Sequence, residues 1–487
     1  MKLNKNKKTI SALRKYIPFA LGLCIKKFSS ASEFFSHRSQ MYLSDSGTTG
    51  VKSELNSITA NPYSIFLELT LGGNMRALQI GILLLILLAA LFYLNREESD
   101  LIIGISLYGA VAITYILLKI LASSWYKPYT NPAPEGLAIA AVIPIFNEDP
   151  VVFRNSLKSL VSQTRPVEEI WVIDDGSDSR ECYLLAKDFF RDTQNAHVLR
   201  YDDNRGKRHA QSLAFRESDA DIFMTCDSDA VLDEKAVEEA LRPFADPEVQ
   251  VVTADVRGLN RSNLLSKLID LRYQNAFKHE RAAYSVFGSV LCATGVLSFY
   301  RGDTIRENLD KYLSQTFLGV PVMAGDDRRL TNYSLERGKS VIQLTSKAET
   351  TVPDKLGKFL RQQIRWNKSF FRESLYVLKN LGPKRIAWWL TLAEMSLWIV
   401  FGATILLAFI IAPLAGGKLL SVYYIGYISI MAYIRNLQVL SGQPWLFILS
   451  PLYGLLHIVL LIPLRFYSLL TIRNSSWMTR AASINAP

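Results

Sequence analysis

The chain alternates between long apolar runs and one long mixed region. Two runs, Ala77–Leu94 and Leu101–Ala122, are long enough as helices, at about 1.5 Å per residue, to cross the roughly 30 Å hydrocarbon layer of a membrane. Their connection, Asn95–Asp100, holds one Arg and three acidic residues, whereas the flanking segments are basic. Because Lys and Arg accumulate on the cytoplasmic side of membrane helices, residues 77–122 are predicted to form a transmembrane hairpin with both ends in the cytoplasm.

The segment before this hairpin is basic and polar. Residues 1–30 carry eight Lys or Arg and no acidic residue, and residues 28–60 are rich in Ser, Thr, Asn and Gly. The apolar stretch Ile17–Cys24 is short and no small-residue cleavage site follows it, which disfavours a signal peptide. We therefore expect residues 1–70 to form a flexible cytosolic tail that lies against anionic lipid.

From Gly136 to Trp366 the apolar runs become short and alternate with helical patterns. Strands that alternate with helices favour an α/β fold with a Rossmann-like, mostly parallel sheet. We expect this sheet to form a cytosolic domain over residues 130–352. The strand candidates are Leu137–Ile143, Glu169–Ile173, His197–Tyr201, Asp221–Cys226 and Val249–Ala254.

After Pro353 the chain is first basic and amphipathic, over residues 353–385, and then strongly apolar, over residues 386–470. The amphipathic segment is predicted to form interface helices, and the apolar segment to form transmembrane helices. Residues 471–487 are predicted to form a cytosolic tail. The apolar blocks are Trp388–Leu414, Leu419–Ile434 and Trp445–Leu470.

The number of crossings in this last region stays open. Glu394 interrupts the first block, so residues 386–396 are expected in the interface and the span is expected to begin near Ser396. Arg473 and Arg480 in the tail favour the cytoplasm, which requires an even number of crossings. Three spans would leave the tail outside. Either one block is re-entrant, or the last block, which contains two prolines, is not a simple span.

The composition agrees with a membrane protein that has a cytosolic domain whose cysteines are in the reduced, thiol form. Of the 487 residues, 49% are hydrophobic and 20% are charged, which is too apolar for a disordered chain. Lys and Arg outnumber Asp and Glu by 55 to 44, a formal charge of +11. The cysteines have no Cys-x-x-Cys or Cys/His spacing, which excludes a disulfide scaffold and a zinc ribbon. They are Cys24, Cys182, Cys226 and Cys292.

Acidic residues follow two of the predicted strands. Asp174-Asp175-Gly176-Ser177 follows one strand, and Asp227-Ser228-Asp229 follows another. Ligands of open α/β sheets bind beyond the carboxyl ends of the strands, where these acids are expected to meet. An Asp-x-Asp pair offers hard oxygen ligands through which Mg²⁺ or Mn²⁺ can bridge to a diphosphate. An ordinary turn is the alternative interpretation of the first cluster.

A basic loop, Asn204–His209, lies between these acids in the sequence and opens a helical pattern. Its Lys and Arg charges and the helix N-terminal N–H groups suit phosphate oxygens, although a solvated basic turn is the alternative. The chain contains neither G-x-x-x-x-G-K-[ST] nor G-x-G-x-x-G, which disfavours nucleoside triphosphate hydrolysis and dinucleotide redox chemistry.

Two further clusters complete the candidate site. Asp326 or Asp327, in a predicted loop before a helix and next to Arg328, is a candidate general base for an acceptor hydroxyl, with helix capping as the alternative. The second cluster is Gln362, Arg365 and Trp366. These positions are spaced i, i+3 and i+4, so on a helix the three side chains share one face, which suits a diphosphate and a sugar ring. A basic interfacial helix with a Trp anchor is the alternative.

Together these clusters predict an inverting sugar-nucleotide transferase, in which an Asp takes the proton of the acceptor hydroxyl and metal and basic groups stabilise the leaving diphosphate. The order DDGS, NRGKRHAQ, DSD, GDDR and QQIRW resembles the processive family-2 glycosyltransferases, which include hyaluronan, chitin and cellulose synthases. The chain is most similar to the class I hyaluronan synthases of streptococcal type, over roughly residues 77–480. The longest similar runs are Asn263–Ser285, Gln315–Tyr333, Arg365–Leu375 and Ser450–His457.

The resemblance implies a glycosyltransferase-A domain and assigns roles to residues. Asp175 would hold the uracil end of UDP, Lys207 the diphosphate, and Asp227 the nucleotide. Asp229 would bind Mg²⁺ or Mn²⁺, and Asp327 would be the catalytic base. The other implied site residues are Asp326 as a second catalytic acid, Asp174 and Arg328 as substrate-binding residues, Gln362, Arg365 and Trp366 at the acceptor end, and Trp477 and Arg480 in the C-terminal motif, also as substrate-binding residues.

The resemblance also implies the reaction and its partners. One chain, functional as a monomer, would add N-acetylglucosamine and glucuronate alternately from UDP-sugars. It would extrude the polysaccharide through its own helices in the plasma membrane, with lipid and no nucleic acid as partners. Two departures from the family pattern bear on the identity of the polymer: Cys292–Val296 replaces the usual Ser-Gly-Pro loop, and Trp477–Arg480 reads Trp-Met-Thr-Arg instead of Trp-Gly-Thr-Arg.

Two alternatives remain. The same machinery could make a one-sugar polymer, such as chitin oligosaccharide or poly-N-acetylglucosamine. A transporter or channel without catalysis is disfavoured, because every expected acid is present and the apolar blocks contain few polar groups.

Overall fold

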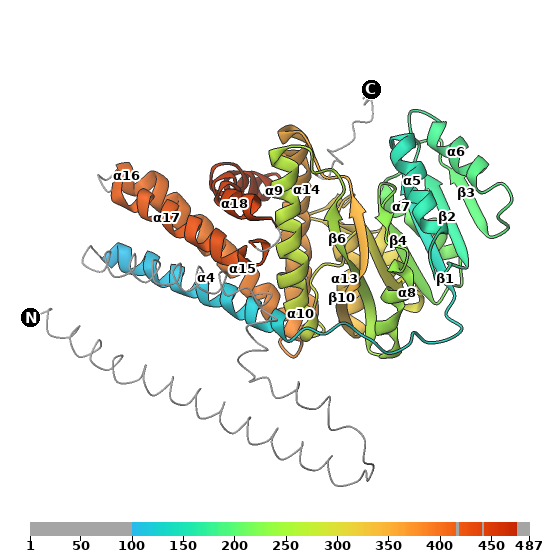
Figure 1. Ribbon diagram of the computed structural model, residues 1–487, viewed down its shortest axis with the longest axis horizontal. Coiled ribbons are helices and arrows are strands. Elements are labelled where there is room, and N and C mark those ends of the chain that lie inside the picture. The colour runs from blue at the N-terminus through green and yellow to red at the C-terminus, as the bar shows by residue number, and fades with distance from the viewer. Residues whose placement is uncertain (1–99, 415–417, 441–442, 475–487) are drawn as a thin grey trace, which may run out of the picture. The chain divides into compact units, whose positions relative to one another are not determined.

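An eight-stranded sheet lies at the centre of the described chain (Figure 1). The computed structural model describes residues 100–414, 418–440 and 443–474. The strand order is β3-β2-β1-β4-β7-β6-β10-β5, with β1 to β4 parallel to one another. All the strands predicted from the sequence are present, with ends that differ by a few residues. They are β1 (Ile139–Ile145), β2 (Glu169–Asp174), β3 (Ala196–Arg200), β4 (Ile222–Cys226) and β6 (Val249–Gly258).

The sequence analysis missed the rest of this sheet. β7 (Leu297–Arg301) runs antiparallel between β4 and β6, and β10 (Lys339–Thr350) pairs with β6 across a register shift. β5 (Val231–Leu232) closes the edge, and β8 (Thr316–Phe317) and β9 (Val320–Pro321) form a separate small hairpin. These strands are short, or polar and irregular, so their pairing depends on partners far away in the sequence.

Both faces of the sheet are buried, which explains the unbroken apolar character of the central strands. Every residue of β1 is buried, and successive side chains point to opposite faces. Ile139, Ala141 and Ile143 pack with helices α5 (Pro150–Val161) and α8 (Ala236–Leu241). Ala140 and Val142 pack with a second layer of helices. That layer contains α7 (Lys207–Glu217), α12 (Leu309–Leu313) and α13 (Asp326–Arg337).

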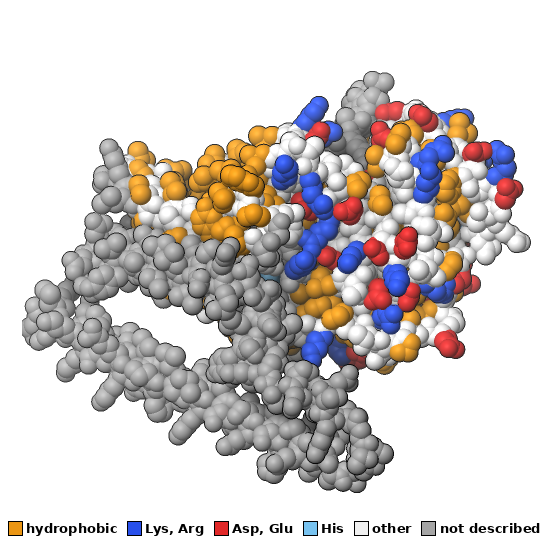
Figure 2. Space-filling model, in the orientation of Figure 1, with side chains coloured by type: hydrophobic (Ala, Val, Ile, Leu, Met, Phe, Trp, Pro, Cys, Tyr) orange, Lys and Arg blue, Asp and Glu red, His pale blue; other side chains and the backbone are white. Residues whose placement is uncertain are grey.

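Apolar helices pack beside the sheet domain (Figure 1). Figure 2 shows hydrophobic side chains over α16 to α18, charged side chains over the sheet domain, and a row of Lys and Arg near α9 between them. Among the described residues, Ile386–Leu414 and Pro444–Leu470 are long and apolar enough to cross a membrane. The helices are α4 (Asp100–Ser124), α9 (Leu264–Asn275), η3 (Ala276–Arg281), α10 (Ala282–Val286), α14 (Leu356–Asn380), α15 (Ile386–Leu406), η4 (Leu407–Ile411), α16 (Ala412–Leu414), α17 (Lys418–Arg435), α18 (Pro444–Leu456), η6 (His457–Leu461) and α19 (Ile462–Leu470). The smaller helices are α6 (Glu181–Phe189), η2 (Arg242–Ala245), α11 (Gly302–Glu307) and η5 (Leu437–Val439).

The structure changes one expectation about these helices and leaves another as a prediction. The first apolar helix begins at Ile386 and includes Glu394, which pairs with Lys119 of α4 at 2.6 Å, and a membrane span that begins near Ser396 stays a prediction. Pro451 and Pro463 do not break the last apolar run, which continues as a helix through the π-type turn η6. The predicted first arm of the hairpin, the tail over residues 1–70 and residues 475–487 lie outside the described residues.

Candidate active site

One large cavity connects the carboxyl edge of the sheet with the apolar helices. Its volume is about 1610 Å³, and side chains from α4, α9, α14, α15, α17 and α18 continue its wall beyond the strand ends. We call it the central cavity. Trp477 and Arg480 lie outside the described residues. The predicted site residues that line the cavity are Asp175, Lys207, Asp227, Asp229, Asp326, Asp327, Arg328, Gln362, Arg365 and Trp366.

The two adjacent acids at the end of β2 have different surroundings. Asp174 is fully buried, binds Ser177 and pairs with Arg200, and it is not part of the cavity wall. The Asp175 carboxylate faces the cavity and accepts the backbone N–H groups of Arg205 and Gly206 at 2.9 and 2.8 Å. Burial raises the pKa of Asp175 from 3.8 to about 6. Asp174 therefore supports the turn, while Asp175 holds the basic loop.

Lys207 forms ion pairs with acidic side chains from two different elements of the fold. Its ammonium group lies 2.7 Å from Asp227 at the end of β4 and 3.2 Å from Asp326 on α13. Burial opposes the charge, but these carboxylates together raise the pKa of Lys207, so its ammonium form is maintained. Lys207 begins α7 directly after Gly206, whose φ of 93° is in the left-handed region that favours glycine. The sequence prediction of a basic loop at a helix start is correct.

Asp326 and Asp327 lie in the first turn of α13, not in the predicted loop, and the N-cap position belongs to Gly325. Both line the cavity, but their protonation differs. Against the effect of burial, Lys207 and Arg208 lower the pKa of Asp326. Burial and the adjacent Asp326 carboxylate raise the pKa of Asp327. A carboxylate with a raised pKa has the greater proton affinity that a general base requires.

The loop that departs from the family pattern lies beside this base. The Cys292 thiol lies 3.6 Å from the Asp327 carboxylate, and the Cys292 carbonyl accepts a hydrogen bond from the Arg281 side chain at 3.0 Å. Burial, with the Asp327 charge, raises the pKa of Cys292 to about 11, so the thiol stays protonated at neutral pH. The departure therefore places a neutral thiol next to the candidate base.

The two acids at the end of β4 can supply part of the ligand set of a divalent metal ion. Within the described residues, no group of three or more His, Cys, Asp and Glu side chains could hold a metal ion by itself. Asp227 and Asp229 nevertheless line one wall of the cavity and supply carboxylate oxygens. Mg²⁺ sites in phosphate chemistry commonly use one or two carboxylates together with substrate phosphates. The pair therefore fits a divalent ion that the diphosphate helps to coordinate.

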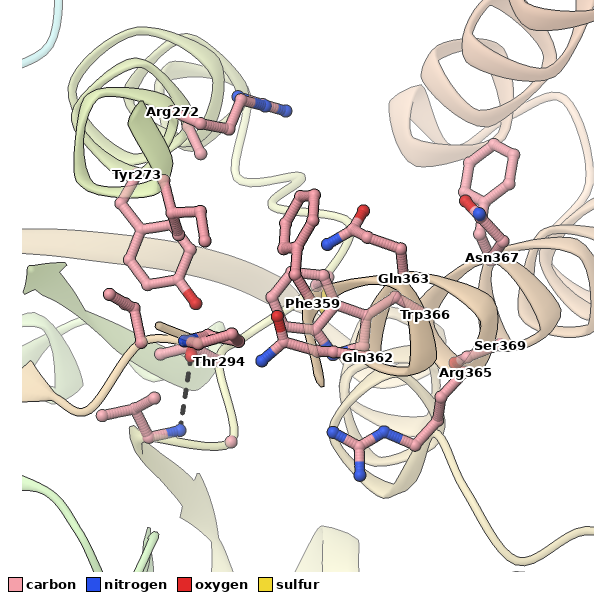
Figure 3. A pocket seen from close by; sticks show the side chains of 18 of the residues that line it. Arg272, Tyr273, Thr294, Phe359, Gln362, Gln363, Arg365, Trp366, Asn367 and Ser369 are labelled. Carbon is pink, nitrogen blue, oxygen red and sulfur yellow. Dashed lines mark hydrogen bonds between the residues drawn. The ribbon is translucent and has the colours of Figure 1, made fainter. Parts of the chain in front are cut away.

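Helix α14 supplies the opposite wall of the cavity (Figure 3). Gln362 and Trp366 extend toward Tyr273 of α9 and Thr294, while Arg365 extends in another direction. The Gln362 carbonyl oxygen is buried without a hydrogen-bond partner, and Trp366 is 41% exposed. A free polar group beside an open indole face is suited to a sugar ring.

Several cavity residues were not found by motif analysis. Tyr273 and Arg272 come from α9, and Thr294 comes from the loop after α10. Lys119 and Glu394 form an ion pair between apolar helices, and Glu394 also accepts hydrogen bonds from tyrosine hydroxyl groups. No short motif marks these residues, because they meet only when the helices pack.

Comparisons with known proteins identify the family of the chain. The family model described as glycosyl transferase family 2 matches residues 140–309. A hyaluronan synthase of Streptococcus pyogenes is 40% identical over 409 residues, which cover 81% of this chain and 95% of the relative. An N-acetylglucosaminyltransferase of Neorhizobium galegae is 32% identical over 418 residues, which cover 78% of this chain and 93% of that protein.

A solved structure supports the fold. A mannosyltransferase from Pyrobaculum calidifontis, in complex with GDP-Man and Mn²⁺, matches 72% of this chain and 98% of its own chain. The TM-score is 0.50 and the sequence identity is 18%, so the likeness concerns the fold alone.

Proposed function

Because the chain belongs to the class I hyaluronan synthases of glycosyl transferase family 2, we propose that it polymerises UDP-N-acetylglucosamine and UDP-glucuronate into hyaluronan. One observation carries the proposal furthest: the cavity that contains the acids of the sheet edge continues between the apolar helices. A polymer that grows at the acids can therefore leave along the same cavity. We propose that the chain is processive and extrudes its product through these helices.

Asp175 and Lys207 bind the donor in this proposal. Asp175 orients the backbone of Arg205 and Gly206 through two hydrogen bonds and contacts the uracil end of the UDP. Lys207, which is charged and paired with Asp227, compensates the negative charge of the diphosphate. Asp227 and Asp229 would hold Mg²⁺ or Mn²⁺ together with that diphosphate. When bound, such an ion neutralises negative charge on the leaving group.

Asp327 acts as the general base of an inverting transfer. The acceptor hydroxyl oxygen forms a bond to the donor sugar's C1, and the C1–O bond to the diphosphate breaks on the opposite face. The hydroxyl proton passes to Asp327, whose raised pKa suits this task. Asp326 is charged and paired with Lys207, and its negative charge raises the pKa of Asp327, whereas the positive charge of Arg328 lowers it. Gln362, Arg365 and Trp366 hold the acceptor end.

We further propose a multi-pass protein of the plasma membrane that functions as a monomer. Residues 130–352 form the cytoplasmic catalytic domain, residues 353–385 lie at the interface, and residues 77–122 and 386–470 form the membrane region. The apolar stretches Ile386–Leu414 and Pro444–Leu470 support membrane association. In this proposal the tails, residues 1–70 and 471–487, are cytosolic.

A one-sugar polymer synthase is the second candidate. It is favoured by the Neorhizobium galegae relative, an N-acetylglucosaminyltransferase, and by the Cys292–Val296 loop beside the base. The same fold and the same base would then act on one donor.

Washed membranes that contain the full chain separate these candidates. They receive Mg²⁺ or Mn²⁺ and radiolabelled UDP-N-acetylglucosamine, with or without UDP-glucuronate, and the product is treated with hyaluronan lyase or chitinase. High-mass product that requires both donors and is degraded by the lyase supports hyaluronan synthesis. Product formed from one donor that resists the lyase supports the second candidate.

A further inference from the structure

Glu373 on α14 is a buried acidic residue that takes no part in the proposed transfer steps. It is 2% exposed, and side chains from other elements bind both of its carboxylate oxygens. Oε2 pairs with the Arg329 guanidinium at 2.9 Å and accepts a hydrogen bond from the Asn332 amide at 3.0 Å. Oε1 accepts hydrogen bonds from the Gln315 amide at 2.8 Å and from Arg329 at 3.2 Å. One carboxylate therefore fixes the positions of three side chains.

The partners of Glu373 belong to the helices that carry the candidate site. Arg329 and Asn332 lie on α13, the helix whose first turn contains Asp327. Glu373 lies seven residues after Trp366 on α14, which is about two helical turns along the same face. Glu373 itself is not part of the cavity wall. It therefore joins the helix of the base to the helix of the acceptor wall from behind the cavity.

A third link reaches the donor side of the site. The Gln315 side chain, which donates to Glu373, accepts a hydrogen bond from the Arg208 guanidinium at 2.5 Å. Arg208 follows Lys207 in the first turn of α7, and its guanidinium also donates to the Tyr312 carbonyl at 3.1 Å. A continuous chain of buried polar contacts therefore runs from Glu373 to the helix that begins with the donor-site lysine.

We propose that Glu373 is a positioning residue, which aligns Asp327 on α13 with the acceptor wall around Trp366 on α14. A buried ion pair adds little net stability, because the desolvation of both charges offsets their attraction, so its main consequence here is a fixed geometry. Alignment matters for the reaction, since a displacement of about 1 Å lowers a rate on the order of 10²-fold. The inference rests on the proposed role of Asp327 as the base, and it holds for either candidate polymer.

The first test is Glu373→Gln in the purified full-length protein in nanodiscs. A donor NH2 group then replaces one accepting oxygen and faces side chains that are themselves donors. We expect kcat for sugar transfer to fall at least about tenfold, because the base and the acceptor lose their alignment. The KM for the UDP-sugars and the Kd for UDP should stay within about twofold, since Lys207 keeps its own pairs with Asp227 and Asp326. Unchanged kcat overturns the inference.

A double variant separates positioning from folding. Glu373→Gln alone leaves the Arg329 guanidinium as a buried, unpaired charge, which destabilises the fold by itself. Glu373→Gln with Arg329→Gln removes that charge, so the Tm should return toward the wild-type value. We expect kcat to stay low, because neutral side chains do not restore the charge-assisted bonds between α13 and α14. Recovery of kcat together with Tm would assign Glu373 a purely structural role and overturn the inference.

Glu373→Asp keeps the charge but shortens the side chain by one methylene group, so its kcat should lie between those of the wild type and Glu373→Gln. If Glu373→Gln does not fold, this variant decides, because a wild-type kcat would contradict the inference.

Glu307→Gln is the matched control. Glu307 pairs with Arg337 of α13 at 3.0 Å, but its side chain is 64% exposed, and an exposed pair contributes little. This variant should have the kcat, KM and Tm of the wild type. Failure of the proposed base is recognised separately, since Asp327→Asn would then transfer sugar at the normal rate.

Discussion

Gly325 and Ser369 approach each other so closely that a Cβ atom on Gly325 would lie 2.2 Å from the Ser369 hydroxyl oxygen. Gly325 precedes α13, which carries Asp327, and Ser369 lies on α14, which carries Gln362 and Trp366. This contact therefore sets the distance between the helix of the base and the helix of the acceptor wall.

Gly325→Ala should impair polymer synthesis severely. The new methyl group collides with Ser369, and a φ of 93° is unfavourable for alanine, a strain of about 1–3 kcal/mol. Polymer formation in membranes and the Tm of the purified protein measure the two effects. Ser369→Ala is the matched control and should remain active, because it removes a buried hydroxyl without a partner. Wild-type activity in Gly325→Ala would show that the helix spacing is adjustable.

Asp327→Asn should abolish polymer synthesis while UDP binding is maintained. The amide preserves shape but cannot accept the acceptor proton, so the rate should fall by at least about 10²-fold. UDP binding is measured by calorimetry and synthesis by incorporation of labelled sugar. Asp310→Asn, an exposed acid on α12, is the control and should be fully active. Normal synthesis by Asp327→Asn would refute the assignment of the base.

Asp229→Ala should abolish activity that added Mn²⁺ does not restore. Removal of a ligand carboxylate weakens the ion's hold, even though the diphosphate supplies other oxygens. Activity over a Mn²⁺ titration and Mn²⁺ binding by paramagnetic resonance in the presence of UDP are the measurements. Full rescue at high Mn²⁺ would show that Asp229 is not an essential ligand. Asp188→Ala, at an exposed position, should behave as the wild type.

Donor binding should weaken as the pH falls below about 6. Burial raises the pKa of Asp175 to about 6, and only its carboxylate accepts both N–H groups of the basic loop. The KM for the UDP-sugars should therefore rise toward acidic pH. A KM that is constant from pH 7 to pH 5 would contradict the role of Asp175.

The effect of pH on the stability of the folded chain should be opposite to its effect on donor binding. Because the pKa of Asp175 is higher in the folded chain than its ordinary 3.8, the folded state binds more protons between these values. The contribution of this group to stability is therefore present at low pH and lost as the pH rises through about 6. The difference in Tm between the wild type and Asp175→Asn isolates this contribution from that of other acids.

Trp366→Ala should shorten the polymer more than it slows the first transfers. The open indole face is suited to hold a terminal sugar, a contact of about 1 kcal/mol, so its loss favours release of the product. Gel analysis of product size, together with initial UDP release, separates these effects. Trp366→Phe keeps an aromatic face and should give intermediate lengths. Unchanged product length in Trp366→Ala would remove Trp366 from the acceptor site.

Local sequence patterns were sufficient to predict the parallel strands of the sheet and the acids at their ends. The apolar runs of β1, β2 and β4 and the acids after them follow from the alternation of strands and helices, since parallel strands end at a common edge. The basic loop before α7 was likewise recognisable, because a glycine followed by Lys and Arg at a helix start is a pattern of neighbouring residues. By contrast, β7 and β10 acquire their positions from partners distant in sequence.

Tertiary structure alone decided which of these residues meet. It separated Asp174, buried against Arg200, from Asp175 in the cavity, although the two are adjacent in the sequence. It also brought Lys207 to Asp326, and Arg272 and Arg435 from different helices to the same Glu280 carboxylate. The physical reason is that hydrophobic periodicity and turn chemistry are properties of neighbouring residues. Charge pairing, pKa shifts and a continuous cavity arise from packing between segments that the sequence places far apart.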